Sequence, residues 1–117
     1  MTENLIIKVY EVVGSEHCVA SSDGQIVFDR VLAALEKQKK VTLSFLNVTA
    51  LTSAFLNAAI GQLYGRFDEK TIKKLLSVKD LQKDDLALLK RVVDTAKAYF
   101  KDPDKFEKAL KDAEKEF

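Results

Sequence analysis

The stretch Val41–Phe67, VTLSFLNVTALTSAFLNAAIGQLYGRF, decides the fold because it has almost no charge and changes its hydrophobic period partway. Up to Phe45, apolar residues alternate with Thr and Ser, which is typical of a β-strand with one buried face. Beyond Thr52 the apolar spacing becomes helical. The stretch therefore predicts a central strand, a loop over 46–51 and a helix that begins at Thr52 or Ser53.

The predicted helix has one face of large side chains and an opposite face of small ones. At 100° per residue, the large face carries Leu56, Ile60, Leu63 and Phe67, and the small face carries Ala54, Ala58, Gly61 and Gly65. The large face is expected to meet the sheet. A glycine inside a helix costs about 1 kcal/mol relative to alanine, and a surface meant for water normally carries charge. We therefore expect a second element to cover the small face, with the chain's own C-terminal helix favoured over another protein.

Upstream, the sequence predicts a strand, a short second strand and a helix. Leu5–Val13 alternates and is rich in β-branched residues, which favours a strand. Gly14 interrupts it, and Glu16–Ala20 reads as a turn with a short strand. The next segment, 21–23, offers side chains that can cap a helix. Its capping residues are Ser21, Ser22 and Asp23, and its apolar positions are Ile26, Val27, Val31, Leu32 and Leu35.

Downstream, the pattern predicts a short helical segment from Asp68, a strand near Leu75–Lys79 and two further helices. The first of these helices runs from Asp84 to about Phe100, and Asp102-Pro103 restarts the second. The expected buried stripe of the long helix is Leu86, Leu89, Val93, Ala96 and Phe100. The last helix has Phe106, Ala109, Leu110, Ala113 and Phe117 on one face.

The chain is expected to form a domain over 1–101 and a C-terminal amphipathic helix over 102–117 that packs on the domain or extends from it. A solvated surface helix laid against the domain is the favoured interpretation, because the helix mixes both signs of charge. A helix that binds a membrane or a partner is the alternative.

Composition restricts the class of protein. The 117 residues suit one domain, and 19 basic against 18 acidic side chains give a net charge of +1. We expect no nucleic-acid partner, because such a balance produces no basic field. No apolar run approaches the roughly 18 residues that span a bilayer, and the N-terminus lacks the pattern of a signal peptide. A cytoplasmic location without a membrane partner is expected.

Catalytic motifs are missing from the sequence. It holds one His and one Cys, too few for a common zinc site, and it contains no Walker loop or GxSxG motif. His17 and Cys18 are adjacent, so in an extended segment they point to opposite faces. Asp84 and Asp85 are most simply residues at a helix start. We therefore expect no enzyme activity, no metal and no cofactor.

The loop-to-helix junction Thr49–Ala54 is the one chemically suggestive place. Its hydroxyl groups lie where free N–H groups at a helix start would stabilise a phosphate, so phosphorylation of Thr52 or Ser53 would be tolerated. The simpler interpretation is that a hydroxyl only caps the helix.

Three segments resemble a family of STAS-like domains of unknown function. They are GSEHCVASSDGQIVFDRVLAAL, VTLSFLNVTALTSAFLNAAIGQLYG and LLSVKDLQKDDLALLKRVVDTAKAYF. Members of this family are distant relatives of STAS domains in sulfate transporters and in antagonists of anti-sigma factors. The resemblance implies an α/β fold with a mixed sheet of about four strands and helices on one side. It also implies a bacterial or archaeal origin and a regulatory role through protein contacts.

In phosphorylatable STAS antagonists the junction reads Asp-Ser-Ser-Gly, and a kinase-type anti-sigma factor modifies the second Ser. By resemblance these four positions fall on Thr52, Ser53, Ala54 and Phe55, so the acceptor position is Ala54, which has no hydroxyl. Ser53 remains as the candidate phospho-acceptor or as the cap.

Two functional hypotheses follow. The first is a non-enzymatic regulatory module that binds a protein partner, such as a histidine-kinase-like ATPase or an anti-sigma-type regulator, and that is able to form a homodimer. The expected surface is Thr52, Ser53, Ala54, Asn57, Ala58 and Gly61, and Ala58→Glu is expected to abolish partner capture while leaving the fold intact. The second is a domain that binds a nucleotide or another anion at the same helix start, with Asp23 and Gly24 nearby.

Overall fold

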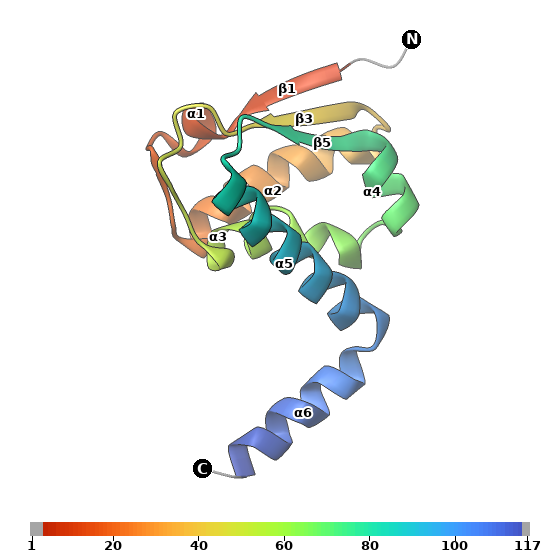
Figure 1. Ribbon diagram of the computed structural model, residues 1–117. Helices are drawn as coiled ribbons and strands as arrows, with labels where there is room; N and C mark the ends of the chain where they lie inside the picture. The colour runs from red at the N-terminus through yellow and green to blue at the C-terminus, as the bar shows by residue number, and fades with distance from the viewer. Residues whose placement is uncertain (1–3, 116–117) are drawn as a thin grey trace.

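The computed structural model describes residues 4–115, apart from the side chain of Phe106. Its elements follow one another in the order shown in Figure 1. They are β1 (Asn4–Lys8), α1 (Val9–Val13), β2 (His17–Cys18), α2 (Ser21–Glu36), β3 (Lys40–Ser44), β4 (Ala50–Leu51), α3 (Ser53–Ala59), the 3₁₀ helix η1 (Gly61–Gly65), α4 (Glu69–Leu75), β5 (Leu76–Lys79), α5 (Lys83–Lys101) and α6 (Pro103–Lys115).

The main sheet has three parallel strands in the order β1-β3-β5. Leu43 of β3 lies between Ile7 of β1 and Val78 of β5. Helices α2, α3 and α5 lie on one side of this sheet (Figure 1). The predicted α/β class is therefore confirmed, but a single mixed sheet of about four strands is not present in the described chain. The short strands β2 and β4 form a separate parallel pair, because each has only two residues and neither reaches the main sheet.

The other face of the main sheet is mostly polar, with the exposed Ile6 beside Thr42. Thr42 donates a hydrogen bond to Asn4 Oδ1 at 3.1 Å, and its hydroxyl lies 2.9 Å from that of Ser77. Ser44 donates to the carboxylate of Asp80 at 2.7 Å. These contacts connect all three strands on the face that the helices leave open.

The prediction of one strand over Leu5–Val13 is wrong in its second half. The strand β1 ends at Lys8, and Val9 begins the short helix α1. Gly14 ends this helix in the left-handed region, with φ of 77°, and its N–H donates to Tyr10 O at 2.9 Å. The alternating pattern of β-branched residues does not reveal the change from strand to helix at Val9, because Val9 is an apolar residue that either conformation can bury; it is fully buried here.

The helix α2 begins earlier than its capping residues suggested. Ser21, Ser22 and Asp23 are inside the helix, and the cap position is Ala20, which forms no side-chain cap bond. Ile26, which was expected in the apolar stripe, is exposed. The buried face of α2 consists of Gly24, Val27, Phe28, Val31, Ala34 and Leu35.

The predicted helix over 53–67 is two elements. The helix α3 ends at Ala59, and a 3₁₀ helix follows from Gly61. Ile60 joins them with φ of −123° and ψ of −45°, outside the geometry of an α-helix. Glycine weakens a helix because it adds backbone freedom, so the break falls where the sequence has its first glycine in this segment.

The C-terminal half follows the predicted order of elements. Asp68 caps α4 by accepting a hydrogen bond from Thr71 N at 2.8 Å. The Thr71 side chain and, to a smaller extent, this backbone N–H lower the pKa of the Asp68 carboxyl. The strand β5 and the helix α5 follow as expected. Within α5, Leu86 is exposed, and Val92 is buried although the predicted stripe omitted it.

The last helix, α6, begins at Pro103, and Asp102 accepts a hydrogen bond from Lys105 N at 3.1 Å, as the Asp102-Pro103 pair predicted. The helix points away from the body of the molecule instead of lying against it (Figure 1). Its described side chains, including Leu110, are exposed. The side chain of Phe106 and the residue Phe117, which the sequence places on the same face, lie outside the described residues.

Candidate functional site

The start of α3 is held by the hydroxyl of Thr52. This hydroxyl accepts a hydrogen bond from Phe55 N at 3.1 Å and donates one to Val19 O at 2.6 Å. Of Thr52 and Ser53, Thr52 is therefore the N-cap of α3, because its hydroxyl accepts the hydrogen bond of a free N–H group in the first turn. Ser53 is the first residue of the helix and its side chain is exposed.

The strands β2 and β4 bring the starts of α2 and α3 together. Cys18 pairs with Leu51, and Glu16 O accepts hydrogen bonds from Thr49 N and Ala50 N. Each strand continues within three residues into a helix. The bond from Thr52 to Val19 O then ties the two helix starts to each other.

The predicted surface residues have different environments. Ser53, Ala54 and Asn57 are exposed, whereas Thr52 and Ala58 are partly buried and Gly61 is buried. Ala58 faces α2, where a Cβ added to Gly24 would lie 2.9 Å from the Cβ of Ala58. The part of the expected surface that a partner can reach is therefore Ser53, Ala54 and Asn57. Ala58→Glu would place a charged side chain at the contact between two helices, so we expect it to destabilise the fold, contrary to the expectation from the sequence.

The small face of the predicted helix is covered by the chain itself only in part: Ala58 is partly buried and Gly61 is buried, whereas Ala54 and Gly65 are exposed. The helix α2 covers Ala58 through Gly24. The helix α5 packs beside Gly61 and Gly65: Ala96 lies 3.5 Å from a Cβ added to Gly61, and the Phe100 ring lies within 3.0 Å of one added to Gly65. The covering elements are α2 and α5, not the last helix.

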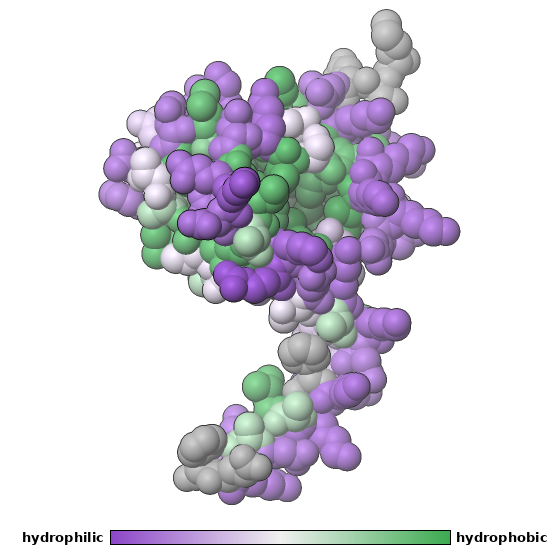
Figure 2. Space-filling model, viewed as in Figure 1, coloured by the Kyte–Doolittle hydropathy of each residue, from purple (hydrophilic) through white to green (hydrophobic). Residues whose placement is uncertain are grey.

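Around the two helix starts lies an exposed surface without charged side chains, which we name the helix-start patch. Its exposed residues are Val19, Ala20, Ser21, Ser22, Ser53, Ala54 and Asn57. In Figure 2 the lower left of the globular part, where α3 lies in Figure 1, is white to green; green also fills the centre of this view, and purple side chains gather along the top and the right. A charge-free surface stands out in a chain in which 32% of residues are charged.

Sequence reasoning missed the first four residues of the helix-start patch. Their signal was the run 17–22, which has no Lys, Arg, Asp or Glu. That run is far from Ser53 in the sequence, and only the pairing of β2 with β4 brings the two together.

Five cavities in the described part of the chain lie away from the start of α3. They have volumes between about 240 and 550 Å³, and residues 52–58 line none of these five. Asp23 is partly buried and Gly24 is buried, packed against α3. Of the two residues expected beside a bound anion, Gly24 thus takes part in helix packing, and Asp23 is only partly exposed.

His17 and Cys18 point to opposite sides of their strand, as predicted. His17 is exposed, with Nε2 3.6 Å from a carboxylate oxygen of Glu16, and Cys18 is fully buried. Burial, with a smaller effect from Asp23, raises the pKa of the Cys18 thiol to about 11. A buried thiol with this pKa is protonated near neutral pH and is a poor nucleophile.

A second group of interacting side chains lies between η1, α4 and α5. Lys97 donates to Glu69 at 2.8 Å, and this bond raises the pKa of the Lys97 ammonium. The same ammonium lies 5.7 Å from the centre of the Tyr64 ring, and partial burial raises the pKa of Tyr64. Lys97 thus connects α5 to both neighbouring elements.

Across residues 4–115, no three His, Cys, Asp or Glu side chains are placed to hold a metal ion. None of the helices described is both long and apolar enough to cross a membrane.

Comparison with known proteins gives one match. The model of a family described as a STAS-like domain of unknown function (DUF4325) matches residues 23–86, which is more than half of the chain. The matched region runs from the first turn of α2 to the start of α5 and includes Thr52, Ser53 and Ala54. No curated protein and no solved structure matches the chain.

Proposed function

The chain belongs to the family of STAS-like domains of unknown function, and we propose that it is a non-enzymatic regulatory module that binds a protein partner through the helix-start patch. The observation that supports this proposal most directly is the charge-free exposed surface at the starts of α2 and α3. Protein interfaces are depleted of charge at their centres, so a patch of this kind suits a docking site better than the charged remainder of the surface.

The contacts of Thr52 support a preformed surface. Its hydroxyl bonds to Val19 O and Phe55 N fix the two helix starts relative to each other. A partner that docks there would meet a rigid surface, and rigid surfaces lose less conformational entropy on binding.

The test is capture of partner proteins by the full chain from a lysate of the source organism. Ala54→Glu places a charge in the helix-start patch, and an acidic residue in the first turn of α3 is compatible with the helix dipole. We expect this variant to lose proteins that the unchanged chain captures. The matched control is Ala33→Glu, which changes an exposed alanine near the far end of α2.

The proposal fails if Ala54→Glu captures the same partners in the same amounts as the control. A circular dichroism spectrum and a melting temperature close to those of the unchanged chain would show that Ala54→Glu is folded. The partner class that we propose is a histidine-kinase-like ATPase or an anti-sigma-type regulator.

We propose further that Ser53 is the residue that such a kinase would modify. Ser53 is exposed at the first position of α3, and the neighbouring Thr52 hydroxyl is occupied by two backbone groups. Incubation of the chain with the captured kinase and labelled ATP is expected to label the unchanged chain and Thr49→Ala but not Ser53→Ala. Equal labelling of Ser53→Ala would contradict this role without affecting the proposed docking surface.

A further inference from the structure

The last helix presents an apolar surface that its own domain does not cover. The helix α6 has 13 residues and points away from the sheet and its helices (Figure 1). Leu110 is 61% exposed, and Ala109 and Ala113 on the same side are also exposed. An isolated helix of this length is only marginally stable in water, so contact with another surface would stabilise it.

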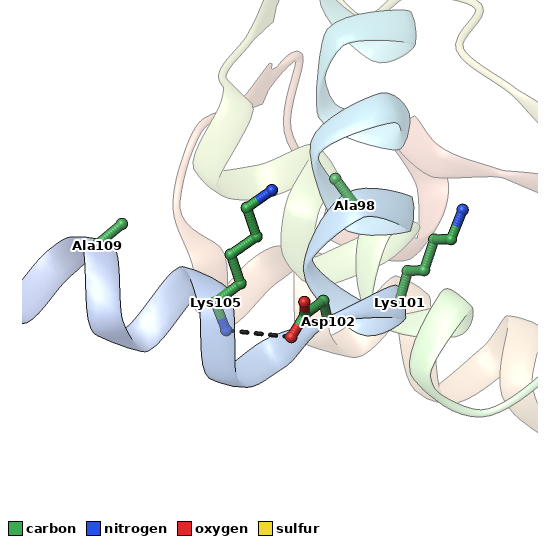
Figure 3. Close-up of a pocket in the computed structure, with 5 residues that line it drawn as sticks. All are labelled: Ala98, Lys101, Asp102, Lys105 and Ala109. Atoms are coloured by element: carbon green, nitrogen blue, oxygen red, sulfur yellow. Dashed lines mark hydrogen bonds between the residues drawn. The ribbon is translucent and has the colours of Figure 1, made fainter.

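The angle between α5 and α6 forms a cavity of about 550 Å³, which we name the elbow cavity. It is lined by Ala98, Lys101, Asp102, Lys105 and Ala109 (Figure 3). The two alanines give it an apolar lining, and its charged residues, Lys101, Lys105 and Asp102, leave its walls with a net positive charge. The carboxylate of Asp102 accepts the hydrogen bond from Lys105 N that caps α6.

The chain's own α6 cannot fill the elbow cavity, because α6 is one of its walls. A helix from another molecule can. A second α6 offers apolar and acidic groups to the cavity: Leu110 projects from its apolar side, and Glu107 and Glu114, three residues before and four after Leu110, are its neighbours on the helix surface. Neither glutamate has an ion-pair partner among the described residues.

We propose that two copies of this chain associate by placing α6 of each copy in the elbow cavity of the other. Leu110 of one copy then contacts Ala98 and Ala109 of the other, and its two glutamates face Lys101 and Lys105. A two-fold axis makes these contacts twice, because each copy supplies both a helix and a cavity. The interface is independent of the helix-start patch, which remains exposed.

The experiment uses two charge-reversed full-length variants, Glu107→Lys/Glu114→Lys and Lys101→Glu/Lys105→Glu. Each variant alone brings like charges together in both contacts, so we expect its dimer dissociation constant to rise about tenfold or more at low ionic strength. An equal mixture pairs lysine helices with glutamate cavities and glutamate helices with lysine cavities. We therefore expect the mixture to regain the affinity of the unchanged chain.

Light scattering coupled to size-exclusion chromatography, over a range of concentrations, measures each association. The matched control is Lys108→Glu/Lys115→Glu, which reverses two lysines on the side of α6 opposite Leu110 and is expected to leave the dimer unchanged. Three outcomes would overturn the proposal: an unchanged chain that stays monomeric, a dimer that neither charge-reversed variant weakens, or a mixture that does not recover. A monomeric chain would indicate that the apolar side of α6 is covered by another surface, such as its own domain after a change in the angle between α5 and α6.

Discussion

Gly24 of α2 and Phe55 of α3 approach so closely that a Cβ added to Gly24 would lie 2.5 Å from the carbonyl oxygen of Phe55. The same Cβ would lie 2.9 Å from the Cβ of Ala58. Only glycine permits this distance between the two helix backbones. The contact also sets the positions of the two helix starts, and therefore of the helix-start patch.

We expect Gly24→Ala to destabilise the chain by about 1–3 kcal/mol, because backbone atoms and a short side chain cannot move aside without separating the helices. The helix propensity of alanine would otherwise stabilise α2 by about 1 kcal/mol. Unfolding in urea measures the change. Ser22→Ala, at an exposed position in the same helix, is the control and is expected to change the stability by no more than about 0.5 kcal/mol. A stabilising Gly24→Ala would contradict the close approach.

Gly61→Ala is expected to behave differently. The atom nearest to its added Cβ is Asn57 Oδ1 at 2.5 Å, at the end of an exposed side chain that can rotate away, and the Cβ of Ala96 lies at an ordinary 3.5 Å. We expect a change of no more than about 0.5 kcal/mol in the free energy of unfolding. A loss as large as that of Gly24→Ala would show that Asn57 cannot move.

Thr52→Ala is expected to cost about 1–2 kcal/mol, because it leaves Phe55 N without its cap and Val19 O without its donor. Thr52→Ser keeps the hydroxyl and is expected to retain most of the stability. Thermal or urea unfolding of both variants measures the difference. Equal losses in the two variants would mean that the methyl group of Thr52, not its hydroxyl, stabilises the junction.

The buried thiol of Cys18 is expected to make the free energy of unfolding depend on pH at alkaline pH. Burial raises the pKa of its thiol from 9.0 to about 11, so the folded state holds the proton more tightly than the unfolded state. The stabilisation is complete below about pH 9 and is lost as the pH rises towards 11. We expect the unfolding free energy of the unchanged chain to fall more steeply across this window than that of Cys18→Ala. Urea unfolding at several pH values gives both slopes, and equal slopes would contradict the burial of the thiol.

Much of the fold can be predicted from local pattern. The central strand, the later strand, the long helix α5 and the Asp102-Pro103 restart all lie close to their predicted positions. Each depends on a short-range signal, such as period-2 alternation or a cap followed by proline. The end of β1 at Lys8 and the break at Ile60 were missed, because both sides of each boundary bury apolar residues and the period does not show where the backbone changes conformation.

The candidate site could be predicted only in part. The sequence identified the junction at Thr52 and Ser53, because hydroxyl residues before a helical pattern are a local signal. It assigned Ala58 and Gly61 to the surface, whereas both pack against other helices. A small uncharged face is equally suited to a partner and to a neighbouring helix, so its composition does not distinguish the two.

By itself the sequence determined that Val41–Phe67 contains a strand, a hydroxyl-capped helix start and a face that must be covered. Those properties depend on residue type and spacing along the chain. Only the tertiary structure decided that α2 and α5 cover part of the face, that Val19 joins Thr52 at one surface, and that α6 leaves the domain with its apolar side exposed. The physical reason is that a periodic pattern fixes which residues share a face, whereas the partner of that face depends on packing between segments distant in the sequence.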